Sequence, residues 1–186
     1  LMRTAIDPFH DYDFDNSYVG DFNGDGKDDL VLHNGNSLGL YVSTGSELEL
    51  NWIATPKITN WEFKSGDKFY VGDFSGDGLD DLFVVNHTGW KNGSTDNPIS
   101  LLGMLRSTGS GFVLENRFDD TLPGWQIKSH DQFYVADFNG DGLDDLFVFN
   151  GAIGVDWSIA YLHMVKSTGK GLYSGHDHRS GLNYVK

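Results

Sequence analysis

Three short acidic segments are the part of this sequence whose residue types and spacing could do chemistry. Each follows the pattern Asp-x-(Asn/Ser)-x-Asp-Gly-x-x-Asp, and they begin at Asp21, Asp73 and Asp137. Side-chain oxygens at positions 1, 3, 5 and 9 of a tight loop can converge on one hard cation, and the main-chain carbonyl of position 7 can add another oxygen. The glycine at position 6 permits the sharp turn. The pattern therefore predicts a cation site in each segment, and we call the segments acidic loops 1, 2 and 3.

Five residues of each acidic loop are the predicted ligands, with position 7 binding through its main chain. They are Asp21, Asn23, Asp25, Lys27 and Asp29 in loop 1, Asp73, Ser75, Asp77, Leu79 and Asp81 in loop 2, and Asp137, Asn139, Asp141, Leu143 and Asp145 in loop 3. Six or seven oxygens in a flexible loop suit Ca²⁺ better than Mg²⁺, which demands octahedral geometry and keeps its waters. We therefore expect three Ca²⁺ sites.

The alternative is an acidic turn that binds no metal, because Asp-Gly and Asn-Gly pairs form turns in any case. Electrostatics weighs against it. Each loop directs three carboxylates at the predicted site, and carboxylates that close repel one another unless a cation lies between them. A fourth carboxylate stands at position 8, as Asp28, Asp80 and Asp144. We expect these three to face solvent or to form local salt bridges.

The acidic loops differ from an EF-hand, which places a bidentate Glu at position 12 between two helices. Position 12 here is Leu32, Val84 or Val148, each within an apolar run. The pattern therefore predicts that each loop caps a β-hairpin.

Each acidic loop belongs to a longer repeat. The segments Phe69–Asn86 and Phe133–Asn150 agree at 15 of 18 positions, and Tyr18–Asn34 matches both. Two further features recur in the same order in every copy: an aromatic residue twelve positions before the first aspartate, and a Ser-Thr-Gly triplet after the loop. These residues are Phe9, Trp61 and Trp125, and the triplets that begin at Ser43, Ser107 and Ser167. The first aspartates of successive copies lie 52 and 64 residues apart. A period of this length indicates one supersecondary unit per repeat.

Each unit contains four segments with the alternation and the aromatic and β-branched content of strands. In the second unit we expect strands at Lys68–Asp73, Asp81–Asn86, about Ile99–Ser107 and Gly111–Phe118. Four-stranded units of this length predict an all-β fold of three four-stranded β-propeller blades. The alternative is a β-sandwich of about twelve strands. Phe9, Trp61 and Trp125 are expected to pack between units, and Tyr18, Tyr70 and Tyr134 to lie in the core.

Composition narrows the classes of function. The 186 residues include 13 Lys and Arg against 27 Asp and Glu, for a net charge of −14, and no Cys. A nucleic-acid binder or a protein that binds anionic membrane is therefore not expected. No apolar run is long enough to span a membrane. No hydrolase or nucleotide-binding motif is present, so the sequence favours a non-catalytic module.

The acidic loops and the strand pattern resemble the FG-GAP/VCBS repeat family over about residues 9–178. The resemblance implies blades at about 9–60, 61–124 and 125–180 of one partial propeller that spans residues 1–186. Propellers of this family usually have seven blades. The chain is therefore expected to be part of a seven-bladed propeller, completed by the remaining blades of a parent chain or by other copies.

The resemblance also implies that the calcium loops lie on one face of the propeller and ligand recognition on the other. Two long loops, His87–Pro98 and Gly151–Trp157, are expected on that second face, against a short loop at Gly35–Leu38. Stacking and polar residues in the long loops are the predicted ligand-binding set: Trp90, Lys91, Asn92, Asp156 and Trp157. The alternative is that Trp90 and Trp157 each fold back to cover their own blade. Sequons at Asn86 and Asn92 would carry glycans only in a glycosylating host.

The function expected from these features is that of a secreted, calcium-binding, adhesion-like module that binds a glycan or an extracellular protein. Two alternatives stay open. The chain could be an accessory propeller of a larger secreted enzyme or toxin, or itself a polysaccharide lyase that recruits His87, His163 or Arg106, although no spacing selects these residues.

Overall fold

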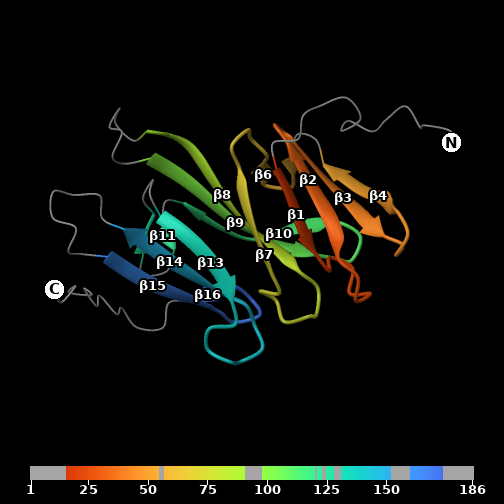
Figure 1. Cartoon of the computed structure of the whole chain (residues 1–186). Helices are drawn as coiled ribbons and strands as arrows, with labels where there is room; N and C mark the ends of the chain where they lie inside the picture. Colours follow the sequence, from red (N-terminus) through yellow and green to blue (C-terminus); the bar gives the residue numbers. More distant parts are fainter. Residues whose placement is uncertain are drawn as a thin grey trace.

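The computed structural model describes residues 16–54, 57–90, 98–119, 121–122, 125–127, 131–151 and 160–173, and these residues form antiparallel strands and no helix. Three four-stranded sheets and two short hairpins follow one another along the chain (Figure 1). The first and third sheets follow chain order, and the second has the order β10-β9-β8-β7, which is the same up-and-down arrangement. None of the described residues forms a helix long and apolar enough to cross a membrane.

The strand bounds show the repeat directly. The first sheet holds β1 (Asn16–Gly20), β2 (Asp29–Asn34), β3 (Ser37–Ser43) and β4 (Leu48–Ala54). The second holds β7 (Lys68–Gly72), β8 (Asp81–Trp90), β9 (Pro98–Ser107) and β10 (Phe112–Asp119). The third holds β13 (Asp131–Ala136), β14 (Asp145–Gly151), β15 (Ala160–Ser167) and β16 (Leu172–Tyr173). The hairpins are β5 (Lys57–Ile58) with β6 (Trp61–Glu62), and β11 (Thr121–Leu122) with β12 (Trp125–Gln126).

The strands of the second sheet lie close to their predicted positions, with one correction. Strand β8 continues past Asn86 to Trp90, and β9 begins at Pro98, so the loop predicted over His87–Pro98 is shorter. The pairing of β8 with β9 contains a register shift between His87 and Gly89 and continues to Trp90. The two short hairpins were not predicted, because two-residue strands carry no detectable alternation.

The first strands of the three sheets lie side by side: β1 against β7, and β7 against β13 (Figure 1). The described strands thus form three sheets, not the two of a sandwich, and they do not close into a ring. Every acidic loop and every Ser-Thr-Gly turn lies at one end of the strands. The β2–β3 turn and the β5–β6 hairpin lie at the opposite end.

The hydrophobic core consists of two clusters, one at each junction between neighbouring sheets. The first includes Phe22 and Leu40 from the first sheet and its loop, with Phe69 and Phe112 from the second. The second includes Phe74, Phe83, Met104, Phe133 and Val165. Trp61 is 3% exposed within the first cluster, which confirms that it packs between units, whereas the side chain of Trp125 and all of Phe9 lie outside the described residues.

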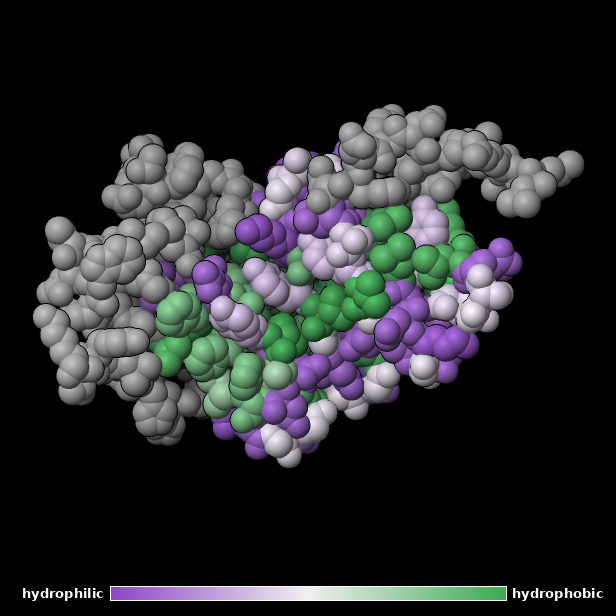
Figure 2. All heavy atoms as spheres, viewed as in Figure 1, coloured by the Kyte–Doolittle hydropathy of each residue, from purple (hydrophilic) through white to green (hydrophobic). Residues whose placement is uncertain are grey.

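The outer side of the third sheet is uncovered by any described strand. Tyr134 is 50% exposed there, so the expectation that it lies in the core was wrong, although Tyr18 and Tyr70 pack against core clusters. The reason is that a following unit buries Tyr18 and Tyr70, while no described unit covers Tyr134. Hydrophobic residues also reach the surface along the band where β1, β7 and β13 lie side by side (Figure 2).

Candidate metal centre

The three acidic loops share one backbone conformation, which the first aspartate of each loop organises. In loop 1, Asp21 Oδ1 accepts hydrogen bonds from the amides of Gly24 (2.7 Å) and Asp25 (3.1 Å), and its Oδ2 accepts one from Gly26 (2.8 Å). Asp73 and Asp137 accept the same three bonds in their loops. The position-6 glycines have φ between 79° and 87°, as the predicted sharp turn requires.

The aspartate at position 5 bonds the amide of position 7 in each loop, at 2.9 Å for Asp25 and 3.0 Å for Asp77 and Asp141. In loop 1 the aspartate at position 5 also has a cationic partner within the loop. Lys27 pairs with Asp25 through its side chain, and this hydrogen bond is the main cause of the lowered pKa of Asp25. A cation that approaches loop 1 would compete with that ammonium group for the same carboxylate.

The aspartate at position 9 is buried in every loop and connects it to the Ser-Thr-Gly turn. Asp29, Asp81 and Asp145 are 1%, 0% and 0% exposed. Their Oδ1 atoms accept hydrogen bonds from the amides of the triplet serines at 2.8, 2.8 and 2.9 Å. Burial raises the pKa of all three carboxyls, to about 7 for Asp81. The recurrence of the triplet was the sequence signal for this contact, but its partner could not be read from the sequence.

The hydrogen bonding of the second carboxylate oxygen, Oδ2, of the position-9 aspartate indicates whether each acidic loop suits a cation. Asp81 Oδ2 accepts a hydrogen bond from the Ser75 amide (3.0 Å), and Asp145 Oδ2 accepts one from Asn139 Nδ2 (2.8 Å). Asp29 Oδ2 is buried and accepts none. A buried carboxylate oxygen without a donor is costly, and a bound cation would satisfy it. With ligands that are all oxygen, loop 1 fits a hard cation such as Ca²⁺.

The predicted ligands lie together in their three loops, but they do not yet surround a common point. Within the described residues, no group of three or more acidic or histidine side chains is arranged to hold a metal ion. The position-1 and position-5 carboxylates are instead turned towards loop amides. Metal binding would therefore require these carboxylates to turn towards the ion while each keeps an amide bond through its other lone pairs.

The position-8 aspartates were predicted to face solvent or to form local salt bridges, and this is wrong for two of them. Asp80 Oδ2 accepts a hydrogen bond from the Asp21 amide (2.8 Å), and the Asp80 amide donates one to Asp21 O (2.9 Å). Asp144 bonds the main chain of Asp73 in the same way, at 2.9 and 3.0 Å. Each thus clamps the acidic loop of the preceding unit. Asp28 is exposed, as predicted, because no unit precedes it among the described residues.

A glycine makes each clamp possible. A Cβ atom at Gly20 would lie 2.5 Å from Asp80 Oδ2, and one at Gly72 would lie 2.7 Å from Asp144 Oδ2. The triplet serines add a second contact, since the hydroxyl of Ser107 donates to Phe22 O (2.6 Å) and that of Ser167 to Phe74 O. Acidic loops 1 and 2 are therefore each held by two residues of the following unit.

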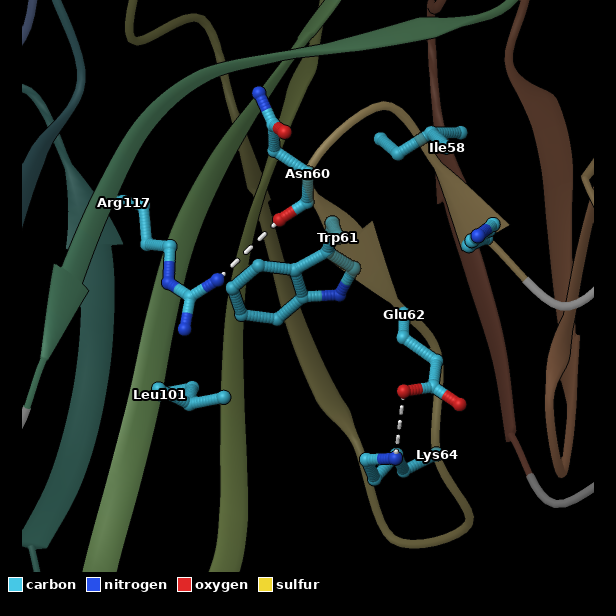
Figure 3. A pocket seen from close by; sticks show the side chains of 8 residues that line it. Ile58, Asn60, Trp61, Glu62, Lys64, Leu101 and Arg117 are labelled. Carbon is cyan, nitrogen blue, oxygen red and sulfur yellow. Dashed lines mark hydrogen bonds and ion pairs between the residues drawn. The ribbon is translucent and has the colours of Figure 1, made fainter.

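At the opposite end of the strands, a pocket of about 360 Å³ lies between the β5–β6 hairpin and strands β9 and β10 (Figure 3). Its lining residues are Lys57, Ile58, Asn60, Trp61, Glu62, Lys64, Leu101 and Arg117. Sequence reasoning missed this site because its cations are scattered over sixty positions and converge only in the fold. We call it the hairpin pocket.

The predicted ligand-binding residues Lys91, Asn92, Asp156 and Trp157 lie outside the described residues, as does the side chain of Trp90, whose backbone ends β8. The sequon at Asn92 also lies outside. Asn86 is 3% exposed and donates through Nδ2 to Asp67 Oδ1. A glycan on Asn86 would break this buried contact, so the folded chain has no room for one there.

Comparison with known proteins supports the resemblance over part of the chain. A search of curated proteins finds no match. Among solved structures, one match is an Agrocybe aegerita lectin described as recognising non-reducing terminal N-acetylglucosamine, at 17% identity and a TM-score of 0.37. The match covers 90% of this chain, which spans about half (51%) of the lectin. The family model of the FG-GAP-like repeat matches residues 21–84, from acidic loop 1 into β8, so this segment carries the repeat that the sequence predicts.

Proposed function

We propose that the protein is a calcium-binding β-propeller module for extracellular recognition, without catalytic activity of its own. The observation that carries the proposal is the buried, unpartnered Oδ2 of Asp29 at the base of a loop whose acidic pattern recurs three times. The fifteen predicted loop residues would hold three Ca²⁺ ions. Bound calcium would neutralise the clustered carboxylates and fix each loop, which is a structural role.

The propeller part of the proposal is supported by the repeated junction between sheets. Both described junctions use the same Asp and Ser clamp, and the first strands of the sheets lie side by side. Repeating one junction generates a curved array. The uncovered side of the third sheet would be completed by the remaining blades of a parent chain or by other copies.

Recognition is assigned to the face away from the acidic loops, with a glycan or an extracellular protein as the partner. Calcium loops of modest affinity suit the high calcium concentration outside cells, which supports a secreted module. This face carries the hairpin pocket, a concave site with polar and apolar groups. No observation favours the lyase alternative: His163 is buried, and Arg106 Nε is paired with Glu115 (3.1 Å).

Calorimetric titration of metal-stripped protein with calcium tests whether the acidic loops bind Ca²⁺. We expect about three Ca²⁺ per chain, and a melting temperature that rises with calcium, since ~100 Kd of ligand adds ~2.7 kcal/mol per site. Asp29→Asn should remove about one equivalent. Asp28→Asn, one position away and exposed, is the matched control and should keep all three. No binding at millimolar calcium would refute the proposal.

A further inference from the structure

The hairpin pocket is built around one buried indole. The β5–β6 hairpin turns at Asn60, a non-glycine residue in the left-handed region (φ 65°). The next residue, Trp61, lays its ring on β9, where a Cβ at Gly103 would lie 2.9 Å from the indole. Ile58 and Leu101 complete an apolar floor. The floor is therefore fixed by backbone geometry and by core packing, not by mobile side chains.

The rim of the pocket concentrates positive charge on an acidic protein. Lys57, Lys64 and Arg117 line it against the single carboxylate of Glu62, while the chain as a whole has a net charge of −14. Arg117 Nη1 donates to Asn60 O (3.4 Å), and Lys64 Nζ pairs with Glu62 (3.1 Å), so both cations are held at the hairpin (Figure 3). Glu62 offsets only one of the three cations, so the described lining keeps an excess of positive charge, and a concave site with such an excess raises the local concentration of anionic ligands.

The floor also holds a polar group that the protein leaves unsatisfied. Trp61 Nε1 is buried and donates to no acceptor. Figure 3 shows it on the side of the ring away from Arg117. The apolar neighbours Ile58 and Leu101 cannot supply an acceptor, and a ligand oxygen in the pocket could accept this hydrogen bond only after the side chains that cover Nε1 move aside.

These groups select among anionic ligands. Cationic rim groups favour a carboxylate or a sulfate. Glu62 would repel a second negative charge, but it can accept a hydrogen bond from a hydroxyl, and the Asn60 amide can both donate and accept. A volume of about 360 Å³ is at the small end of sites for small molecules. The best match is a compact ring with one carboxylate, several hydroxyls and an apolar C–H face.

We infer that the hairpin pocket binds a uronic-acid unit of a glycan, with its carboxylate between Lys57 and Arg117 and its ring over the apolar floor. This inference rests on the recognition role proposed for this face. It does not depend on calcium, because the pocket and the acidic loops lie at opposite ends of the strands.

The test is an NMR titration of the full chain with methyl glucuronide, and with methyl glucoside and its 6-sulfate as matched probes. For one small sugar we expect a Kd of about 1 mM for the glucuronide, binding at least tenfold weaker for the neutral glucoside, and binding of the 6-sulfate no tighter than that of the glucuronide. The indole N–H resonance of Trp61 should shift with the glucuronide. Arg117→Gln should weaken binding about tenfold and Lys57→Gln somewhat less, while Lys170→Gln, an exposed cation far from the pocket, should change nothing.

Several outcomes would overturn the inference: no binding, equal binding of the neutral sugar, tighter binding of the sulfate, or a Trp61 resonance that stays fixed while others move. Arg117 and Lys57 are exposed, so their variants should fold, and melting temperature confirms this. The calcium titration is a separate readout. Three bound Ca²⁺ without glucuronide binding would reject only the pocket, whereas glucuronide binding without calcium would reject only the metal sites.

Discussion

Phe74 and Phe138 occupy the same position of two nearly identical repeats, yet Phe74 is 0% exposed and Phe138 is 47% exposed. The local sequences differ only at Gly72/Ala136 and Ser75/Asn139, so the difference in burial comes from the neighbouring unit. Asp144 and Ser167 of the third unit bond the main chain around Phe74, and the third sheet covers its ring. No described unit does this for Phe138. Burial in this chain is therefore a property of the junction between units, as in other repeat proteins.

The uncovered loop also differs in one residue from the covered ones. Ala136 stands where the first two units have Gly20 and Gly72, the glycines that make room for the aspartate clamp. A following unit that used the same clamp would therefore meet a methyl group and would have to sit slightly farther out. Comparing acidic loops 2 and 3 therefore separates the stability that a loop has within its own unit from the stability that contacts with the following unit add.

The largest expected effect is on the stability of the covered junction. Phe74→Ala removes a fully buried ring and should lower the free energy of unfolding by about 3–5 kcal/mol. Phe138→Ala, the same change in the same sequence context, should cost less than about 1 kcal/mol. Urea unfolding followed by tryptophan fluorescence measures both. Equal losses would mean that Phe138 is covered in solution, for example by a second copy of the chain. Dilution would then reduce the loss of stability caused by Phe138→Ala.

A smaller effect concerns a buried carboxyl at the start of the second unit. Asp67 is 0% exposed, and burial is the main cause that raises its pKa to about 6. Because the folded-state value lies above the unfolded value of about 3.8, folding favours the protonated form. The contribution of Asp67 to the free energy of unfolding is fully present below about pH 4. It is lost as the pH rises through 6, and the total loss is about 3 kcal/mol.

In metal-free buffer, we therefore expect stability to fall between pH 4 and 7, and Asp67→Asn to flatten that decline by about 3 kcal/mol. Unfolding by urea at a series of pH values measures the slope. The absolute stability of the variant will also change, because its amide presents a donor to the Lys64 amide that now bonds Asp67 Oδ2 (3.0 Å). The slope is the informative quantity, and a slope that matches the wild type would contradict the assignment.

The comparison also shows which features could be predicted from the sequence. The acidic loops, the strands of each unit and the packing of Trp61 follow from local pattern and recurrence, and all appear in the structure. The role of Asp80 and Asp144 could not be foreseen, since it depends on how closely the preceding loop approaches. The exposure of Tyr134 and the hairpin pocket likewise depend on which residues distant in sequence become neighbours. Recurrence identifies units, but it does not identify the partner of each unit.

The smallest effect separates the clamp from the acidic pattern itself. Asp144→Ala leaves the partly buried Asp73 amide without its acceptor and should cost about 1–3 kcal/mol. Asp28→Ala removes the same position-8 carboxylate from the first unit, where it is exposed and clamps no described residue, and should stay within about 0.5 kcal/mol of the wild type. Asp144→Asn keeps an oxygen that can accept the bond and should fall between the two. Because Asp73 is also a predicted calcium ligand, Asp144→Ala should in addition weaken calcium binding at loop 2 more than at loop 3, which no described residue clamps. Identical stability of Asp144→Ala and Asp28→Ala would show that the Asp144 carboxylate contributes nothing to the junction, and that apolar packing, the Ser167 hydroxyl and the main-chain bond of residue 144 hold the units together.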